Sequence, residues 1–316
     1  MPGQDPTETN YVSDIDPATW DSCDNTGYVA DTFSIIELDY TDRPYAGLSL
    51  LSDDIVTRER ILDEDNVPRV EMDGELIYFP TNMIQYALGL LDDQVISGTN
   101  KSALTTVESI AAKLVEMSLR SETDILFPYN LDFPLHGSRS GETMVRPWYS
   151  AMAQGQALTL FCRLHTVTGK TSYLEICHKI GESFKRIKGS GRSPWISCID
   201  KNGNLWLEEY PCDLPCFTLN GKIFAIFGLY DYFLLTHDPH VAHLLRAAIT
   251  TIKVNIERFR APGGYSYYCL KHKFCHVQYP EYHDVHVEQL EFLHAITRDD
   301  YFAEMATAFR DDTPTK

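Results

Sequence analysis

Basic residues are scarce in this chain. It has 27 Lys and Arg against 45 Asp and Glu, which gives a formal net charge of −18 over 316 residues. Nucleic-acid binding needs a basic face for the phosphates, so this balance argues against nucleic acid as a general partner. An anionic substrate would need a local pocket of positive potential to overcome the field of the whole protein.

Several sequence signatures are also missing. The eight Cys form no C-x-x-C pair, and Cys212 and Cys216 have no matching second pair, so we expect free thiols in a reducing compartment. The chain has no P-loop, no G-x-G-x-x-G and no G-x-S-x-G, so nucleotide cofactors and α/β-hydrolase chemistry lack support.

Long apolar runs are absent as well. The first 20 residues are acidic and polar and show no signal peptide. The most apolar window, 216–235, contains Lys222 and Asp231, which indicates a buried helix and not a membrane span. We therefore expect a cytoplasmic protein with no membrane span.

Helical periodicity dominates after Pro80. Four segments open on an aromatic residue with polar or small neighbours and then turn apolar, and their starts lie about 65–70 residues apart. One helix pair per repeat of this length is typical of an α/α array. We predict a mainly α protein, an incomplete α/α toroid of about four helix pairs. The inner segments are 78–91, 148–165, 217–235 and 282–296, and the segments between them are 103–118, 173–187 and 239–256.

The N-terminal part differs in composition. Residues 1–30 are rich in Asp, Thr, Pro and Asn, and we expect a flexible arm. Residues 31–80 carry short β-type runs such as 33–38, and Asp73-Gly74 predicts a β-hairpin. We expect the α/α-barrel domain to span 81–316.

Polar residues recur near the starts of the inner helical segments. At one end of a toroid these groups would meet and line a pocket. Helix capping or buried hydrogen bonding is the alternative for any one of them. The residues are Asn82, Gln85, Gln154, Gln156, Asn220, His286 and Gln289.

Two loops carry proton-active side chains. Glu208 and Glu209 are adjacent carboxylates beside Tyr210, an arrangement that raises the pKa of one acid if it is not simply a solvated turn. Loop 263–286 concentrates Tyr, Lys and His residues, and its H-x-x-H pair lacks a well-spaced third ligand, so we predict no metal. The relevant residues of this loop are Tyr268, Lys271, His272, Tyr282, His283 and His286.

These motifs resemble the D-glucuronyl C5-epimerase family, specifically its C-terminal helical domain. Residues 148–157 read W-Y-S-A-M-A-Q-G-Q-A, a run characteristic of that family. Four further family motifs follow in order, with changes: L-E-E-Y-P at 207–211, L-N-G-K at 219–222, Y-C-L-K-H at 268–272 and E-Y-H-x-x-H-x-x-Q-L at 281–290.

The resemblance implies an α/α barrel that converts glucuronate to iduronate in a heparan-type polymer, without metal or redox cofactor. It implies that Glu209 and Tyr282 form the acid/base pair at C5, with Tyr210 and Tyr268 as supporting phenols. Lys271 takes the place of an Arg that neutralises the substrate carboxylate. A homodimer is expected. We expect further substrate contacts from Trp148, Tyr149, Gln154, Gln156, Asn220, His272, His283, His286 and Gln289.

Departures from the family keep other functions open. Lys271 replaces Arg, Cys269 and Glu281 replace Asp, and the β-rich domain of the animal enzymes is missing, so the substrate could be shorter, unsulfated or another uronide. The alternatives are a uronate polysaccharide lyase, an α/α-toroid glycoside hydrolase that uses Asp132, and an inactive sugar-binding module.

Overall fold

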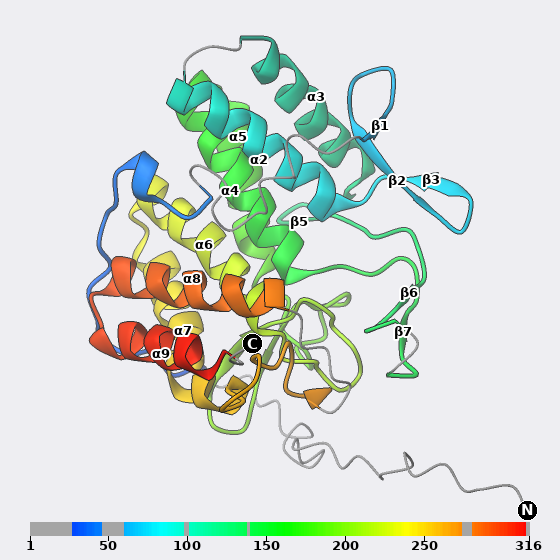
Figure 1. Cartoon of the computed structure of the whole chain (residues 1–316). Coiled ribbons are helices and arrows are strands. Elements are labelled where there is room, and N and C mark those ends of the chain that lie inside the picture. The colour runs from blue at the N-terminus through cyan, green and yellow to red at the C-terminus, as the bar shows by residue number, and fades with distance from the viewer. Residues whose placement is uncertain (1–26, 46–59, 98–100, 138–139, 274–279, 314–316) are drawn as a thin grey trace, which may run out of the picture.

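The computed structural model describes residues 27–45, 60–97, 101–137, 140–273 and 280–313, without the side chains of 93–97 and 101. Its helices (Figure 1) are α2 (Pro80–Ser97), α3 (Lys101–Met117), α4 (Ala151–Thr168), α5 (Thr171–Ser183), α6 (Leu219–Thr236), α7 (Pro239–Asn255), α8 (Pro280–Thr297) and α9 (Asp300–Asp312). Its short strands are β1 (Ile61–Leu62), β2 (Pro68–Met72), β3 (Glu75–Ile77), β4 (Leu119–Arg120), β5 (Ile125–Leu126), β6 (Phe133–Pro134), β7 (Thr143–Met144), β8 (Ser197–Ile199) and β9 (Leu205–Leu207).

Helices of two kinds build the fold. Helices α4 and α6 are buried over most of their length, because their sequences are apolar nearly all round. The inner helices pack in chain order, α2 against α4, α4 against α6 and α6 against α8. Each inner helix also packs against the helix that follows it, α3, α5, α7 or α9. The prediction of an incomplete α/α toroid with four helix pairs is confirmed in the described residues.

Glycine allows the two central helices to approach closely. A Cβ on Gly155 of α4 would lie 2.3 Å from the Cα of Ala225 on α6. A Cβ on Gly228 of α6 would lie 2.0 Å from the carbonyl oxygen of Gly155. No side chain fits at either distance, so this pair of glycines fixes where α4 crosses α6.

Side-chain caps mark where three of the helices begin. Ser150 accepts a hydrogen bond from the Ala153 amide at the start of α4, and Asp238 accepts one from the His240 amide at α7. Asp299 caps α9 in the same way. Helix α9 was not expected from the sequence, because its residues are too polar on average to stand out beside the inner helices.

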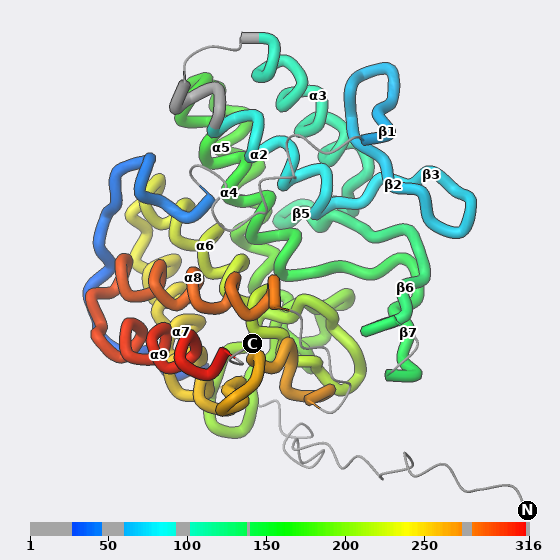
Figure 2. Tube along the Cα trace, viewed as in Figure 1, coloured from blue at the N-terminus to red at the C-terminus, as the bar shows by residue number. Residues whose placement is uncertain are grey.

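The segment before the toroid departs from one expectation. Residues 33–38 form no strand, because their backbone groups bond elsewhere: the Ile36 amide donates to the Ile296 carbonyl at 2.8 Å, and the Leu38 amide donates to the Tyr230 hydroxyl. Figure 2 shows this N-terminal segment passing the C-terminal ends of α6 and α8. Residues 1–26 of the expected arm lie outside the described residues.

The predicted hairpin at Asp73-Gly74 is present. Strands β2 and β3 pair antiparallel with Met72 opposite Glu75, and β1 pairs with β2 to complete a three-stranded sheet. Asp73 and Gly74 both have positive φ, 51° and 81°, as a tight two-residue turn requires.

A buried ion-pair network joins the N-terminal segment to the toroid. The guanidinium of Arg163 lies 2.9 Å from Asp92 and 3.4 Å from Asp231, and it donates to the Pro44 carbonyl. Asp92 also accepts a hydrogen bond from Tyr40.

Among the helices that the structure describes, none has the length and apolar character needed to cross a membrane.

Candidate active site

A cleft of about 400 Å³ opens where the four inner helices begin. It is lined by residues from the first turns of α2, α4, α6 and α8 and from the loops that lead into them. The starts of the four inner helices therefore converge at one end of the toroid, but of the seven polar residues predicted there only Asn82, Gln85 and Asn220 line the cleft. The lining residues are Phe79, Thr81, Asn82, Gln85, Tyr129, Phe133, Trp148, Ser150, Met152, Glu209, Tyr210, Asn220, Phe224, Tyr268, Glu281, Tyr282 and Val285.

Glu209 is the buried carboxylate of this cleft. It follows strand β9 and is only 7% exposed, and its two carboxylate oxygens accept the hydroxyl of Tyr268 at 3.0 and 3.2 Å. Burial raises the pKa of Glu209 to about 7, although hydrogen bonds from Tyr210 and Tyr268 act to lower it. The carboxyl group can therefore give or take a proton near neutral pH.

The first turn of α6 packs directly against the Glu209 side chain. A Cβ on Gly221 would lie 2.2 Å from Oε2 and 2.7 Å from Cβ of Glu209. Only glycine leaves room for the carboxylate against the start of the helix. The position of Glu209 is thus set by the backbone of α6 as well as by its phenol partners.

Three phenols lie in the same cleft as this carboxylate. Burial raises the pKa of both Tyr210 and Tyr268 well above the usual value, and the neighbouring Glu209 raises it further, so both stay protonated. Tyr282 lies on the first turn of α8, is 37% exposed, and its ring centroid is 4.7 Å from that of Tyr268. The three tyrosines and Glu209 therefore share one cleft, as the family resemblance implied for their positions.

Glu208, next to Glu209, points away from the cleft and supports the loop. Its Oε2 accepts the backbone amides of Cys216 and Phe217, just before α6 begins. Burial raises its pKa to about 7, and burial lowers the pKa of Lys222 behind it to about 7. The sequence analysis named Glu208 but not its proximity to Lys222, because Lys222 looks like an ordinary charged residue until its burial is known.

Lys271, expected to neutralise the substrate carboxylate, lies outside this cleft. Its Nζ is 2.6 Å from Oε1 of Glu142 and donates to the Leu214 carbonyl at 2.9 Å. Together with Tyr149 it lines a neighbouring cleft of about 550 Å³, and Trp148 forms part of the wall of both clefts. Among the described residues that line the Glu209 cleft, none is Lys or Arg.

The expected histidine contacts lie away from the cleft. The ring of His283 accepts a hydrogen bond from the Ser266 amide and forms another with the Phe309 carbonyl. The ring of His286 forms a hydrogen bond with the Ser266 hydroxyl at 2.7 Å. Burial lowers the pKa of His286 to about 3, which keeps it neutral. His272 contacts Glu142. These histidines hold chain segments together.

Three of the four predicted glutamines, Gln154, Gln156 and Gln289, are buried, and two of these make hydrogen bonds to the backbone. Gln154 donates to the Ile125 carbonyl and accepts the Phe127 amide, which ties α4 to strand β5 and the residue after it. Gln289 donates to the Asn220 carbonyl at the start of α6, and Gln156 is fully buried on α4. Of the expected helix residues that could contact substrate, the cleft contains Asn220, Asn82 and Gln85.

Tyr129, Phe79 and Phe133, which the sequence analysis did not single out, complete the wall beside the predicted Trp148. The rings of Tyr129 and Trp148 stack with centroids 3.9 Å apart, and Phe79 and Phe133 pack around them. Phe79 directly precedes α2, so the aromatic start of that segment was a usable signal. Asp132, the acid considered for a hydrolase, is half exposed and bonds Arg146 outside the cleft.

The architecture defines the class of protein. Cellobiose 2-epimerase from Bacillus thermoamylovorans B4167 matches with a TM-score of 0.56 at 12% identity, over 84% of this chain and 72% of that chain. Cellobiose 2-epimerase from Spirochaeta thermophila DSM 6192 matches with a TM-score of 0.51 at 12% identity, over 81% and 65%. At this identity the likeness defines the fold alone, and that fold is the α/α toroid.

Sequence comparison identifies the particular family. The family model described as D-glucuronyl C5-epimerase C-terminus matches residues 121–311. The chain therefore belongs to the D-glucuronyl C5-epimerase family through this C-terminal region.

Two curated relatives extend the comparison. The D-glucuronyl C5-epimerase of Caenorhabditis elegans is 26% identical over 193 residues, 55% of this chain and 30% of that protein. "Uncharacterized protein MJ1128" of Methanocaldococcus jannaschii is 25% identical over 197 residues, 62% of this chain and 60% of that protein. The match thus spans less than two thirds of either relative.

Proposed function

We propose that this protein is a carbohydrate epimerase that inverts C5 of a glucuronate residue in a glycan to give iduronate. The observation that carries the proposal is the state of Glu209. Its carboxyl group is buried in the cleft, has a pKa of about 7 and accepts a hydrogen bond from the Tyr268 hydroxyl, in a chain that belongs to this family. Its substrate is a heparosan-like glycan that contains glucuronate residues.

Inversion at C5 needs two proton-active groups. The proton on C5 is acidified by the adjacent carboxylate, and its removal leaves an enediolate-like dianion. Glu209 takes this proton from one face as its carboxylate, and the Tyr282 hydroxyl delivers a proton to the other face. The tyrosinate then regains a proton from solvent, which its partial exposure allows, and Glu209 releases the proton that it took to solvent as the product leaves. Tyr268 holds Glu209 through its hydroxyl.

The dianion must be stabilised without the lysine that the sequence suggested. All four inner helices begin at the cleft, so the positive ends of four helix dipoles point toward it. The side-chain amides of Asn82, Gln85 and Asn220 stand at the same helix starts and can donate to carboxylate oxygens. Fixed dipoles of this kind supply positive potential in a protein that is strongly acidic overall.

The aromatic wall suits a sugar ring. Tyr129, Trp148 and Phe133 present flat apolar faces in the same cleft as the polar groups. A pyranose has apolar C–H faces and polar edges, so it pairs with such a mixed lining. The neighbouring cleft shares Trp148, which would allow an adjacent residue of a polymer to bind beside the reacting one.

The test is product analysis by NMR after incubation with unsulfated glucuronate polymers. We expect iduronate signals, no unsaturated uronate and no shortening of the polymer. Glu209→Gln and Tyr282→Phe should each lower the rate by about 10²–10⁴-fold. Tyr265→Phe is the matched control, because Tyr265 packs against His283 outside the cleft, and its rate should be unchanged. Unsaturated products would indicate a lyase, and shortened polymers a hydrolase.

A further inference from the structure

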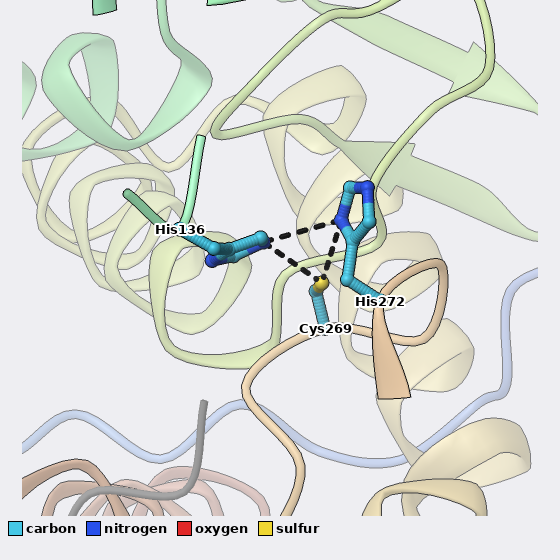
Figure 3. A group of neighbouring side chains, drawn as sticks. All are labelled: His136, Cys269 and His272. Carbon is cyan, nitrogen blue, oxygen red and sulfur yellow. Dashed lines mark hydrogen bonds between the residues drawn. The ribbon is translucent and has the colours of Figure 1, made fainter. Parts of the chain in front are cut away.

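Three metal-ligand side chains converge beside the Glu209 cleft. His136 comes from the turn between β6 and β7, and Cys269 and His272 come from the segment that follows Tyr268 (Figure 3). The Nε2 of His136 is 3.2 Å from Nδ1 of His272, and the Cys269 sulfur is 3.4 Å from each of these nitrogens. Figure 3 shows the three side chains pointing toward one another.

These separations match the edges of a tetrahedral site. With zinc–nitrogen and zinc–sulfur bonds of about 2.05 and 2.3 Å at tetrahedral angles, neighbouring ligand atoms lie about 3.3–3.6 Å apart. The three observed distances fall at or just below this range. An ion at bonding distance from all three atoms therefore fits with little movement of the side chains.

A carboxylate fixes one of the imidazoles in the required orientation. The Nε2 of His272 lies 3.2 Å from Oε2 of Glu142, so it can donate its proton there and turn the lone pair of Nδ1 toward His136 and Cys269. Metal-binding histidines commonly have such a carboxylate partner. Lys271 forms an ion pair with the same Glu142, so it contacts the carboxylate that orients His272 and is not itself a ligand.

We propose that His136, Cys269 and His272 bind one divalent transition-metal ion, for which Zn²⁺ is the best match. Two imidazoles and a thiolate select zinc or cobalt over calcium or magnesium, which prefer oxygen ligands. Cys216 stands in a separate group with Glu142 and His272 and does not belong to this triad.

A bound ion would restrict the movement of Tyr268, whose hydroxyl donates a hydrogen bond to Glu209. Cys269 directly follows Tyr268, and the His136 ring packs edge-on against the Tyr268 ring with centroids 5.6 Å apart. An ion bound here links the β6–β7 turn to the Tyr268 segment. These residues therefore act as positioning residues for the cleft, and the ion itself stays outside it.

The test measures metal binding directly and needs no substrate. The full chain, stripped with a chelator and dialysed, is titrated with Zn²⁺ and Co²⁺ in competition with a chromogenic chelator. We expect one ion per chain, a rise in Tm with Zn²⁺, and a near-ultraviolet thiolate-to-cobalt absorption band. Because failure here leaves the epimerase assay untouched, the two proposals are tested separately.

Variants assign the ligands. Cys269→Ser should abolish the cobalt–thiolate band and weaken binding by at least about a hundredfold, and Glu142→Gln should weaken it by about 10–100-fold. Cys177→Ser, at a buried cysteine that contacts Cys162 elsewhere, is the control and should bind as the parent does. If the parent binds no stoichiometric ion, or if Cys269→Ser keeps the band and the affinity, the triad is only a hydrogen-bonded cluster and the proposal is overturned.

Discussion

Replacing Gly221 by Ala tests whether the α6 backbone sets the position of the reacting carboxylate. The new Cβ would lie 2.2 Å from Oε2, 2.7 Å from Cβ and 2.8 Å from Cδ of Glu209. Non-bonded carbon atoms prefer about 3.5–4.0 Å, so the Glu209 side chain must move by about 1 Å. Such a displacement of a reacting group costs on the order of a hundredfold in rate.

The assay combines turnover with stability. For Gly221→Ala we expect about a hundredfold loss of epimerisation rate and a drop in unfolding free energy of about 1–3 kcal/mol from overpacking. Gly264→Ala is the matched control, because the nearest atoms to its Cβ lie at 3.5 and 3.8 Å, an ordinary contact distance. A folded Gly221→Ala protein that turns over at the parental rate would refute this account of how Glu209 is placed.

Three further predictions concern protonation and stability. The folded-state pKa of Glu209, about 7, exceeds the unfolded value of 4.5, so its stabilising contribution is complete below the unfolded pKa and is lost as the pH rises through 7. Glu209→Gln should therefore raise the free energy of urea unfolding at pH 8 by on the order of 1–3 kcal/mol, with a smaller gain at pH 5, and an equal gain at both would contradict the assignment. The kcat/KM of the parent should rise with pH through about 7 as Glu209 loses its proton, and a pH-rate profile that is flat there would exclude Glu209 as the base. Arg163→Met should cost about 3–5 kcal/mol in chemical denaturation, because it leaves Asp92 buried without its cation and Asp231 with only the more distant Arg43, at 3.8 Å; a cost near zero would show that this network is not needed.

The helical scaffold was predictable because its signal is local. The inner helices α4 and α6 carry long apolar runs at helical spacing, and their repeated starts indicated the pairs. Helix α9 was not predicted, because its short sequence is polar on average. Residues 33–38 have the composition of a strand, but their backbone partners are Tyr230 and Ile296, which only the tertiary structure brings near.

The candidate site was predictable only where its residues stand in motifs. Glu209, Tyr210, Tyr268 and Tyr282 share a cleft, as expected for their motif positions. The position of Lys271 was not predictable, because its partner Glu142 lies 129 residues earlier in the chain.

The cluster of His136, Cys269 and His272 could not be predicted from the sequence either. His136 is 133 residues from Cys269, so no spacing rule links them, and the sequence indicated no metal site. Pairings of this kind depend on how loops fold back over the helix starts, which periodicity does not describe.

The most direct test of the central claim is solvent exchange at C5. Unsulfated glucuronate polymer is incubated with the protein in D₂O, and label is located by NMR, with Glu209→Gln run in parallel. We predict deuterium at C5 in both glucuronate and iduronate residues with the parent, and almost none with Glu209→Gln. Iduronate that forms without deuterium at C5, or equal labelling by the variant, would contradict proton transfer through Glu209.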